Sequence, residues 1–379
     1  MSRVRLALTM VVRDEADVIE ATLRYHLHQG VDLFVVSDHA SRDGTREILE
    51  DYARAGFVHV IDRPGGDFPP GRRLIQGEWQ TEMARLAATE HGADWVINSD
   101  ADEFWWPVLG TLKDTFAEVP ERFGVLTAPR PDFLPRPDGP EPFVERMVVR
   151  QLLSDRRVKQ AHRGRADVVV GIGSHDVRAE GLVEVPWFPA RILHFPMRSV
   201  AQYEKRMRFR AAGLAVSGKN QDWWDAYREG RLPELFASRA LGDAEAQVAV
   251  REGRAVVDTR LRDFLAGCPD PLADRSRLPD PEPRRRAEPG ALRPSWLADG
   301  ALQAELAEVQ LDALSALARR VRDLEGDRER ARERLEERRE TIRRLKAERG
   351  EGRPAGLDAP GIAAVRRAWR RVRARRSPG

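Results

Sequence analysis

Cysteine is almost absent from this sequence of 379 residues, which contains only Cys268. A single cysteine cannot form an intrachain disulfide, and this suits a reducing compartment. Long apolar runs are absent too, since none approaches the roughly 20 residues that a membrane-spanning helix needs. The short apolar stretch after Met1 continues into Arg13-Asp14-Glu15 without a small-residue cleavage site, so we expect a first strand rather than a signal peptide. These absences predict a cytoplasmic protein.

Acidic residues are missing from the end of the chain. The formal net charge is only +3, yet the segment from Gly361 to Gly379 carries seven arginines and no acidic residue. Two interpretations of the basic tail 351–379 stay open. It is an amphipathic helix that lies peripherally on the anionic inner face of the cell membrane, or it is a disordered tail. We expect no nucleic acid partner.

A heptad pattern precedes this tail. Apolar residues recur at alternating spacings of three and four, at positions Leu314, Leu317, Val321, Leu324, Ala331, Leu335, Ile342 and Leu345. The pattern predicts a coiled-coil helix over 301–350 and a homo-oligomer formed through it. Arg328 and Arg338 fill two seam positions, which favours the alternative of a single charged helix. Proline and arginine dominate 269–300, a composition typical of a linker.

The first hundred residues alternate between short apolar runs and segments of helical periodicity. The strands are expected at 5–12, 33–37, 58–61 and 95–98, and the helices at 16–29, 44–55 and 77–91, with Asp14 and Ser41 or Asp43 as N-caps. Such alternation predicts parallel strands that bind ligands beyond their carboxyl ends. Shorter β-like runs over 122–195 predict antiparallel strands that complete the sheet. We therefore predict a mixed α/β sheet flanked by helices in a domain 1–230, and a helical extension over 231–268.

The run from Trp95 to Trp106 carries the strongest chemical signal. An apolar strand ends at Asp100-Ala101-Asp102, and the alternating spacing lets both carboxylates approach one hard cation. Oxygen ligands select Mg²⁺ or Mn²⁺. Such an ion neutralises the charge that develops on a departing diphosphate. A bare Asp-x-Asp also occurs by chance, so its place after the fourth strand supports the assignment.

A polar turn follows the second predicted strand, from Asp38 to Thr45. The Asp38 carboxylate can accept the N3 hydrogen of a uracil or thymine ring, and Gly44 permits the tight turn into the next helix. The alternative is an ordinary capped turn, because Ser, Asp and Gly are common turn residues.

The three motifs together resemble a family 2-like glycosyltransferase of GT-A fold, over roughly Arg3 to Lys219. The matching segments are Thr9-Met-Val-Val-Arg-Asp-Glu-Ala, the Asp38 to Thr45 turn, and Asp100-Ala-Asp-Glu-Phe. The resemblance implies that Thr9, Val11, Arg13 and Glu15 line a nucleoside pocket, that Asp38 reads the base, and that Asp100 and Asp102 hold diphosphate and metal. It also implies a nucleotide-sugar donor, and we expect a glycan or lipid-linked acceptor.

Further site residues are less sharply defined. The family resemblance suggests that a histidine completes the metal site, and His175 and His194 are the candidates. The alternative is that each is a buried core residue. Inverting transfer needs a carboxylate to deprotonate the acceptor hydroxyl. The candidates are Asp132, Asp155, Asp176 and Glu184, of which we select Asp176. Trp187, Trp223 and Trp224 are candidates for stacking on an acceptor sugar, and Arg72, Arg73 and Arg85 for contacting phosphate.

Two rival functions remain. A sugar-phosphate nucleotidylyltransferase needs a glycine-rich loop after the first strand, and Val12-Arg-Asp-Glu contains no glycine. A catalytically inactive transferase-like scaffold carried on a coiled coil is the second, and the intact acids at positions 38, 100 and 102 argue against it.

Overall fold

A computed structural model describes residues 4–63, 73–108, 110–152, 158–185, 188–211, 221–274, 276, 278 and 336. The predicted coiled coil, the basic tail and most of the predicted linker lie outside these residues. No helix in the described part of the chain is both long enough and apolar enough to cross a bilayer.

The core is a six-stranded mixed sheet with the order β3-β2-β1-β4-β8-β6. Its strands are β1 (Leu6–Val12), β2 (Leu33–Asp38), β3 (Val58–Asp62), β4 (Trp95–Ser99), β6 (Val125–Pro129) and β8 (Val158–Arg163). The first four are parallel, and β8 runs antiparallel to both β4 and β6. The predicted strands and the predicted antiparallel completion are confirmed. The carboxyl ends of β1, β2 and β4 consequently meet at one edge.

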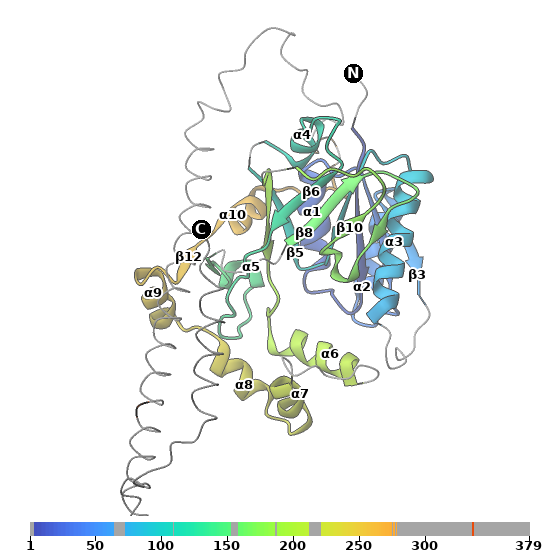
Figure 1. The fold of residues 1–379 in the computed structure, drawn as a ribbon. Helices are drawn as coiled ribbons and strands as arrows, with labels where there is room; N and C mark the ends of the chain where they lie inside the picture. The colour runs from blue at the N-terminus through green and yellow to red at the C-terminus, as the bar shows by residue number, and fades with distance from the viewer. Residues whose placement is uncertain are drawn as a thin grey trace, which may run out of the picture. The chain divides into compact units, whose positions relative to one another are not determined.

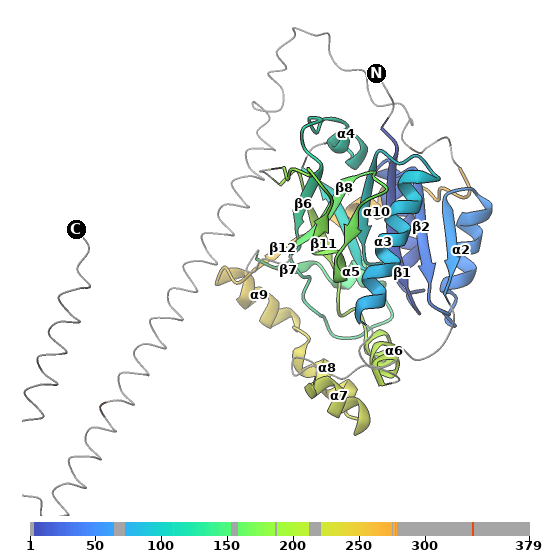
Figure 2. The ribbon, with the colours of Figure 1, turned by 45° about the vertical axis from the view of Figure 1, so that its right-hand side comes forward.

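Helices cover both faces of this sheet in a three-layer arrangement that Figures 1 and 2 show from two sides. The helices α1 (Ile19–His28) and α2 (Thr45–Arg54) pack in a large apolar cluster with Leu8, Phe34 and Ile97 of the strands. On the other face, α3 (Arg73–Thr89) packs Met83, Ala84 and Ala87 against the neighbouring strand positions. The alternation of side chains along each strand produces these two cores.

None of the predicted residues occupies an N-cap position, although the Asp43 carboxylate accepts from the amide of Thr45, the first residue of α2, at 3.1 Å. Val18 occupies the N-cap position of α1, and Gly44, with φ 102°, occupies that of α2. The Asp14 carboxylate instead accepts from the Arg42 backbone amide at 2.7 Å, and Asp43 accepts from the Ala16 amide at 3.2 Å. These side chains therefore join the loops that follow β1 and β2, and only the tight turn predicted at Gly44 is confirmed.

Smaller sheets extend the core. Strand β5 (Glu103–Pro107) pairs with β11 (Ala190–His194), β7 (Val149–Gln151) with β12 (Ala255–Val257), and β9 (Val169–Val170) with β10 (Val177–Arg178). The short helices are α4 (Leu112–Ala117), α5 (Phe143–Arg146) and the 3₁₀ turn η1 (Ile172–Ser174).

Among the described residues, five helices follow β11, three of them within the predicted helical extension over 231–268, which also contains the unpredicted strand β12. The helices are α6 (Val200–Ala211), α7 (Gln221–Arg228), α8 (Leu232–Arg239), α9 (Asp243–Arg251) and α10 (Arg260–Gly267). Helix α10 packs on α1, where Arg24 donates to the Leu265 carbonyl at 2.6 Å and the rings of Tyr25 and Phe264 lie 5.1 Å apart. Residues beyond the predicted boundary at 230 thus belong to the main core.

Candidate active site

The acidic turn lies at the carboxyl edge of the sheet, between β4 and β5. Asp100 directly follows β4, and Asp102 directly precedes β5. The Asp100 amide donates to the Glu103 side chain at 3.0 Å, and Thr22 of α1 donates to the Ala101 carbonyl at 2.5 Å. The turn is therefore fixed both from within and from the helix beneath it.

A buried ion network binds Asp100. Lys159 of β8, fully buried, contacts the Asp100 carboxylate at 2.8 Å and the buried Glu103 carboxylate at 3.1 Å. Arg130 contacts the other oxygen of Glu103 at 2.7 Å. Burial alone would raise the pKa of Asp100, but the Lys159 ammonium holds this pKa below its usual value. Burial alone would lower the pKa of Lys159, and the two carboxylates raise it. Lys159 therefore stays charged, and Asp100 stays ionised.

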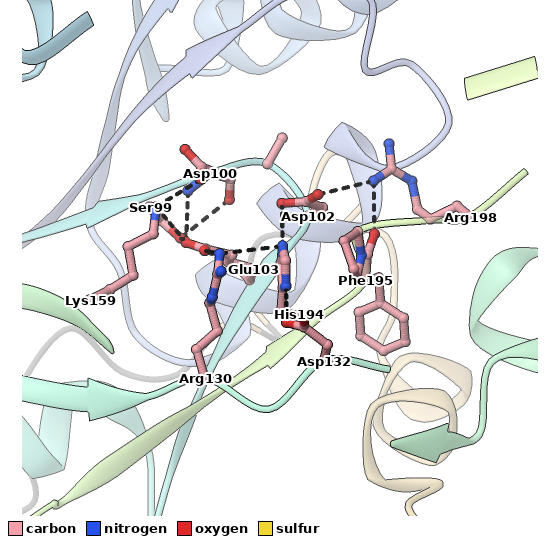
Figure 3. A network of polar contacts seen from close by, with 12 residues as sticks. Ser99, Asp100, Asp102, Glu103, Arg130, Asp132, Lys159, His194, Phe195 and Arg198 are labelled. Carbon is pink, nitrogen blue, oxygen red and sulfur yellow. Dashed lines mark hydrogen bonds and ion pairs between the residues drawn. The ribbon is translucent and has the colours of Figure 1, made fainter. Parts of the chain in front are cut away.

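Asp102 faces a histidine and an arginine, as Figure 3 shows. The distance from Asp102 Oδ1 to His194 Nε2 is 3.6 Å, and Arg198 approaches Oδ2 at 3.5 Å. On the other side of the imidazole, His194 Nδ1 lies 2.6 Å from Asp132 Oδ1. Because Glu103 of β5 pairs with His194 of β11, the strand register brings this histidine to the acidic turn.

Arg198 joins the start of α6 to the loop after β1. Its fully buried guanidinium contacts Glu15 at 2.5 Å and Asp17 at 2.7 Å, in addition to Asp102. Burial raises the pKa of Glu15 to about 7, with Asp102 and Asp17 adding to the shift and Arg198 opposing it. Lys205, further along α6, contacts Asp43 at 2.7 Å. Helix α6 is thus tied to the loops after β1 and β2.

The network carries excess negative charge. Six acidic side chains face three permanent cations, namely Glu15, Asp17, Asp100, Asp102, Glu103 and Asp132 against Arg130, Lys159 and Arg198. Even with Glu15 half protonated near pH 7, the negative charges outnumber the positive ones. An imbalance of this sign attracts a cation, and oxygen with imidazole nitrogen is a suitable donor set for Mn²⁺.

The fit to a metal ion is partial. Within the described residues, no three His, Cys, Asp or Glu side chains converge at metal-binding spacing. Asp102 and His194 do converge as a pair, because two ligands each about 2.1 Å from one ion lie roughly 3.0–3.6 Å apart. The 3.6 Å between Asp102 Oδ1 and His194 Nε2 falls at the upper end of that range.

The residues expected to bind a nucleoside do not converge on one pocket. Asp38 ends β2 at the same edge, but Ser41 donates to its carboxylate at 2.6 Å and Arg46 approaches at 3.6 Å. Thr9 is buried and donates to the Asn98 side chain at 2.9 Å, so its side chain lies inside the sheet rather than at a pocket. Val11 packs beside the α3 core, and Arg13 lies 4.0 Å from Asp14. Of this group, Glu15 joins the ion network through Arg198.

Other predicted residues lie outside the network. His175 donates to the Val158 carbonyl at 2.6 Å, and the Asp176 carboxylate pairs with Arg178 at 2.7 Å. The Glu184 carboxylate accepts from Thr127. Trp223 packs on Tyr203, Trp224 stacks on Tyr227, and Arg85 donates to the Val168 carbonyl. Arg72, Asp155, Trp187 and the Arg73 side chain are outside the described part of the chain.

Sequence reasoning missed Lys159, Arg130 and Arg198. Arginine is too frequent for any one to stand out, but lysine is not, because only five of the 64 basic residues are lysines. The compact ammonium of Lys159 fits between the buried Glu103 carboxylate and the half-buried Asp100 carboxylate, where a planar guanidinium would need more space. A lysine within 122–195, the region in which antiparallel strands are predicted, was therefore an available signal in this arginine-rich chain.

Comparisons with known proteins give one family match. No curated protein matches the chain. Among solved structures, TarS 1–349 of S. aureus aligns with 13% identity over 60% of this chain and 71% of that chain, with a TM-score of 0.31. The same TarS fragment in complex with UDP-GlcNAc aligns with 12% identity over 69% and 89% of the two chains, with a TM-score of 0.34. Residues 10–123 match the model of glycosyltransferase family 92, which is not the family 2 that the motifs resemble. The matched residues contain the loops after β1 and β2 and the acidic turn.

Proposed function

We propose that this protein transfers a hexose-type sugar from a nucleotide-diphosphate donor to an acceptor hydroxyl, with Mn²⁺ or Mg²⁺ bound at the acidic turn. The observation that supports this most is the carboxylate-rich network at the carboxyl edge of parallel strands, where ligands of such sheets bind. The family match over 10–123 covers the same loops.

Each part of the network has a role in this proposal. Asp102 and His194 hold the ion, and Asp100 lies on the same turn, ionised by Lys159. When bound, the ion neutralises the charge that develops on the diphosphate leaving group. Arg198 orients Asp102 and ties α6 over the loop that carries Glu15.

The nucleoside lies, in this proposal, against the joined loops after β1 and β2. The carboxylate of Asp38 would accept the N3 hydrogen of uracil on Oδ2, since Ser41 donates to Oδ1 and Arg46 lies 3.6 Å from Oδ2. We therefore test uridine diphosphate first. Direct displacement with inversion, a base such as Asp176, and a glycan or lipid-linked acceptor complete the proposal.

Titration calorimetry with uridine diphosphate, with and without Mn²⁺, tests the site. We expect Mn²⁺-dependent binding that Asp102→Asn abolishes, because the substitution removes a charged ligand while keeping the shape of the side chain. Asp243→Asn, on the exposed start of α9, is the control and should bind as the wild type does. Nucleotide binding and donor hydrolysis that are independent of metal would reject the assignment.

Assays on the same purified protein distinguish the two rival functions. A scaffold would bind neither nucleotide nor metal. A nucleotidylyltransferase would release pyrophosphate from a nucleoside triphosphate and a sugar phosphate, whereas a glycosyltransferase would release a nucleoside diphosphate from a nucleotide sugar.

A further inference from the structure

The hydrogen-bond partners of His194 define how its ring is protonated. Nδ1 lies 2.6 Å from the Asp132 carboxylate, which only accepts when ionised, so Nδ1 carries hydrogen. Nε2 lies 3.4 Å from an Arg130 nitrogen, and guanidinium groups only donate. Both contacts favour one neutral tautomer, with hydrogen on Nδ1 and a lone pair on Nε2.

The backbone holds Asp132 rigidly in place for this contact. Residues 132 and 194 form an isolated parallel bridge, and the Phe133 amide donates to the His194 carbonyl at 2.8 Å. The Gln151 amide donates to the Asp132 carbonyl at 2.8 Å, and the rings of Phe133 and Phe195 stack at 4.1 Å. The chain segments on both sides of the contact are therefore paired, and the carboxylate is fixed beside the imidazole.

The lone pair then meets a second acceptor. His194 Nε2 faces Asp102 Oδ1 at 3.6 Å, and neither atom can donate to the other in this tautomer. Arg130 is a weak competitor for Nε2, since its short contact, 2.7 Å, goes to Glu103. Two acceptors that face each other are stabilised by a cation between them.

We propose that Asp132 is a positioning residue, which holds His194 in the Nδ1-protonated tautomer and so directs the Nε2 lone pair toward Asp102. The inference rests on the proposed function only for the identity of the ion. Asp132 is therefore no longer a candidate for the catalytic base, because its carboxylate accepts the hydrogen bond from His194.

Nitrogen NMR of the full-length protein labelled with ¹⁵N-histidine tests the tautomer without metal. The chain has eight histidines, and the spectrum of His194→Gln identifies the signal of His194 by its loss. We expect a protonated Nδ1 and a bare Nε2 in the wild type. Asp132→Asn should shift this signal toward a mixture of tautomers, because an amide both donates and accepts. A wild-type signal of an imidazolium or of the opposite tautomer overturns the proposal.

Mn²⁺ titration of the same proteins gives the second readout. We expect Asp132→Asn to weaken Mn²⁺ binding about 10–100-fold, as is usual for partners of ligating histidines. Glu184→Gln, an exposed acid bonded to Thr127 outside the network, should leave the affinity unchanged. If Asp132→Asn misfolds, Asp132→Ser replaces it in both measurements. Unchanged tautomer and affinity in the variants would overturn the positioning role even if donor binding is found, whereas a wild type that binds no Mn²⁺ would reject the proposed function and leave the tautomer result standing.

Discussion

His26 shows how a single buried side chain fixes its own charge. Its Nδ1 donates to the Thr22 carbonyl at 2.8 Å, and its Nε2 accepts from the Trp105 backbone amide at 3.2 Å. A proton on Nε2 would face a donor, and burial, partly offset by the Thr22 bond, lowers the pKa of His26 to about 4. The neutral histidine thereby joins α1 to β5 beneath the acidic turn.

A pH dependence of stability follows. The folded pKa of His26 lies below its ordinary 6.5, so the unfolded chain binds the proton first as pH falls. The contribution of His26 to the free energy of unfolding should be constant above pH 6.5 and should fall by up to about 3 kcal/mol between pH 6.5 and 4. Glu15, whose pKa is raised to about 7, contributes a slope of the opposite sign between pH 4.5 and 7, so the His26 contribution is read as the difference between the wild type and a His26 variant. Urea titrations across this range measure it.

A variant separates His26 from His162, whose pKa burial also lowers to about 4. His26→Gln should remove about half of the decrease that these two histidines cause, and His162→Gln should remove the rest. If His26→Gln leaves the pH slope as in the wild type, the assignment of the neutral form is wrong.

At the scale of elements, most strands could be predicted, and the site that they form could not. The runs ending at Val12, Asp38 and Ser99 are apolar and short, so a buried parallel sheet followed from composition. The caps failed because Asp14 and Asp43 bond to each other's loops, a tertiary choice that local propensity does not contain. Strand β5 was missed because Glu103, a fully buried acid, interrupts the apolar pattern expected of a strand.

The Asp-x-Asp motif was placed correctly but interpreted too simply. The sequence predicts two carboxylates on one ion, whereas Lys159 holds Asp100 and the pair His194 and Arg198 faces Asp102. Lys159 lies 59 positions beyond Asp100, and His194 and Arg198 lie 92 and 96 positions beyond Asp102. No local pattern encodes contacts over such separations.

Arg198 is the buried anchor of helix α6, which Lys205 also attaches through Asp43. Arg198→Met leaves Glu15, Asp17 and Asp102 without their shared cation, which costs about 3–5 kcal/mol for a broken buried pair. We expect faster backbone amide exchange in α6 while the amides of β1 stay protected. Arg208→Met removes an exposed cation of the same helix and should leave both sets unchanged. Equal acceleration in α6 and β1 would show that the arginine stabilises the whole core instead.

At the scale of the molecule, α10 completes the main core. Leu265 and Leu261 lie in the same apolar cluster as α1 and β1, although a boundary was predicted near residue 230. Helices α6 to α8 form a separate cluster around Tyr203, Trp223 and Phe236. The predicted boundary divides the chain at one point in the sequence, whereas α10 rejoins the main apolar cluster after α6 to α8 have formed a separate one.

Leu265→Ala tests this division. Truncation of a buried leucine should lower the free energy of global unfolding by about 2–5 kcal/mol, in one cooperative transition. Phe236→Ala, in the separate cluster, should increase amide exchange in α6 to α8 with a smaller effect on the main transition. A purely local effect of Leu265→Ala would make α10 an independent element.

The return of α10 to α1 also has a consequence for biosynthesis. Arg24 and its acceptor Leu265 are 241 residues apart. At about 5–20 residues per second, a ribosome needs roughly 10–50 s to make the intervening chain. Throughout that interval Tyr25 lacks its contact with Phe264, so the nascent polypeptide presents the apolar surface that α10 later covers to chaperones.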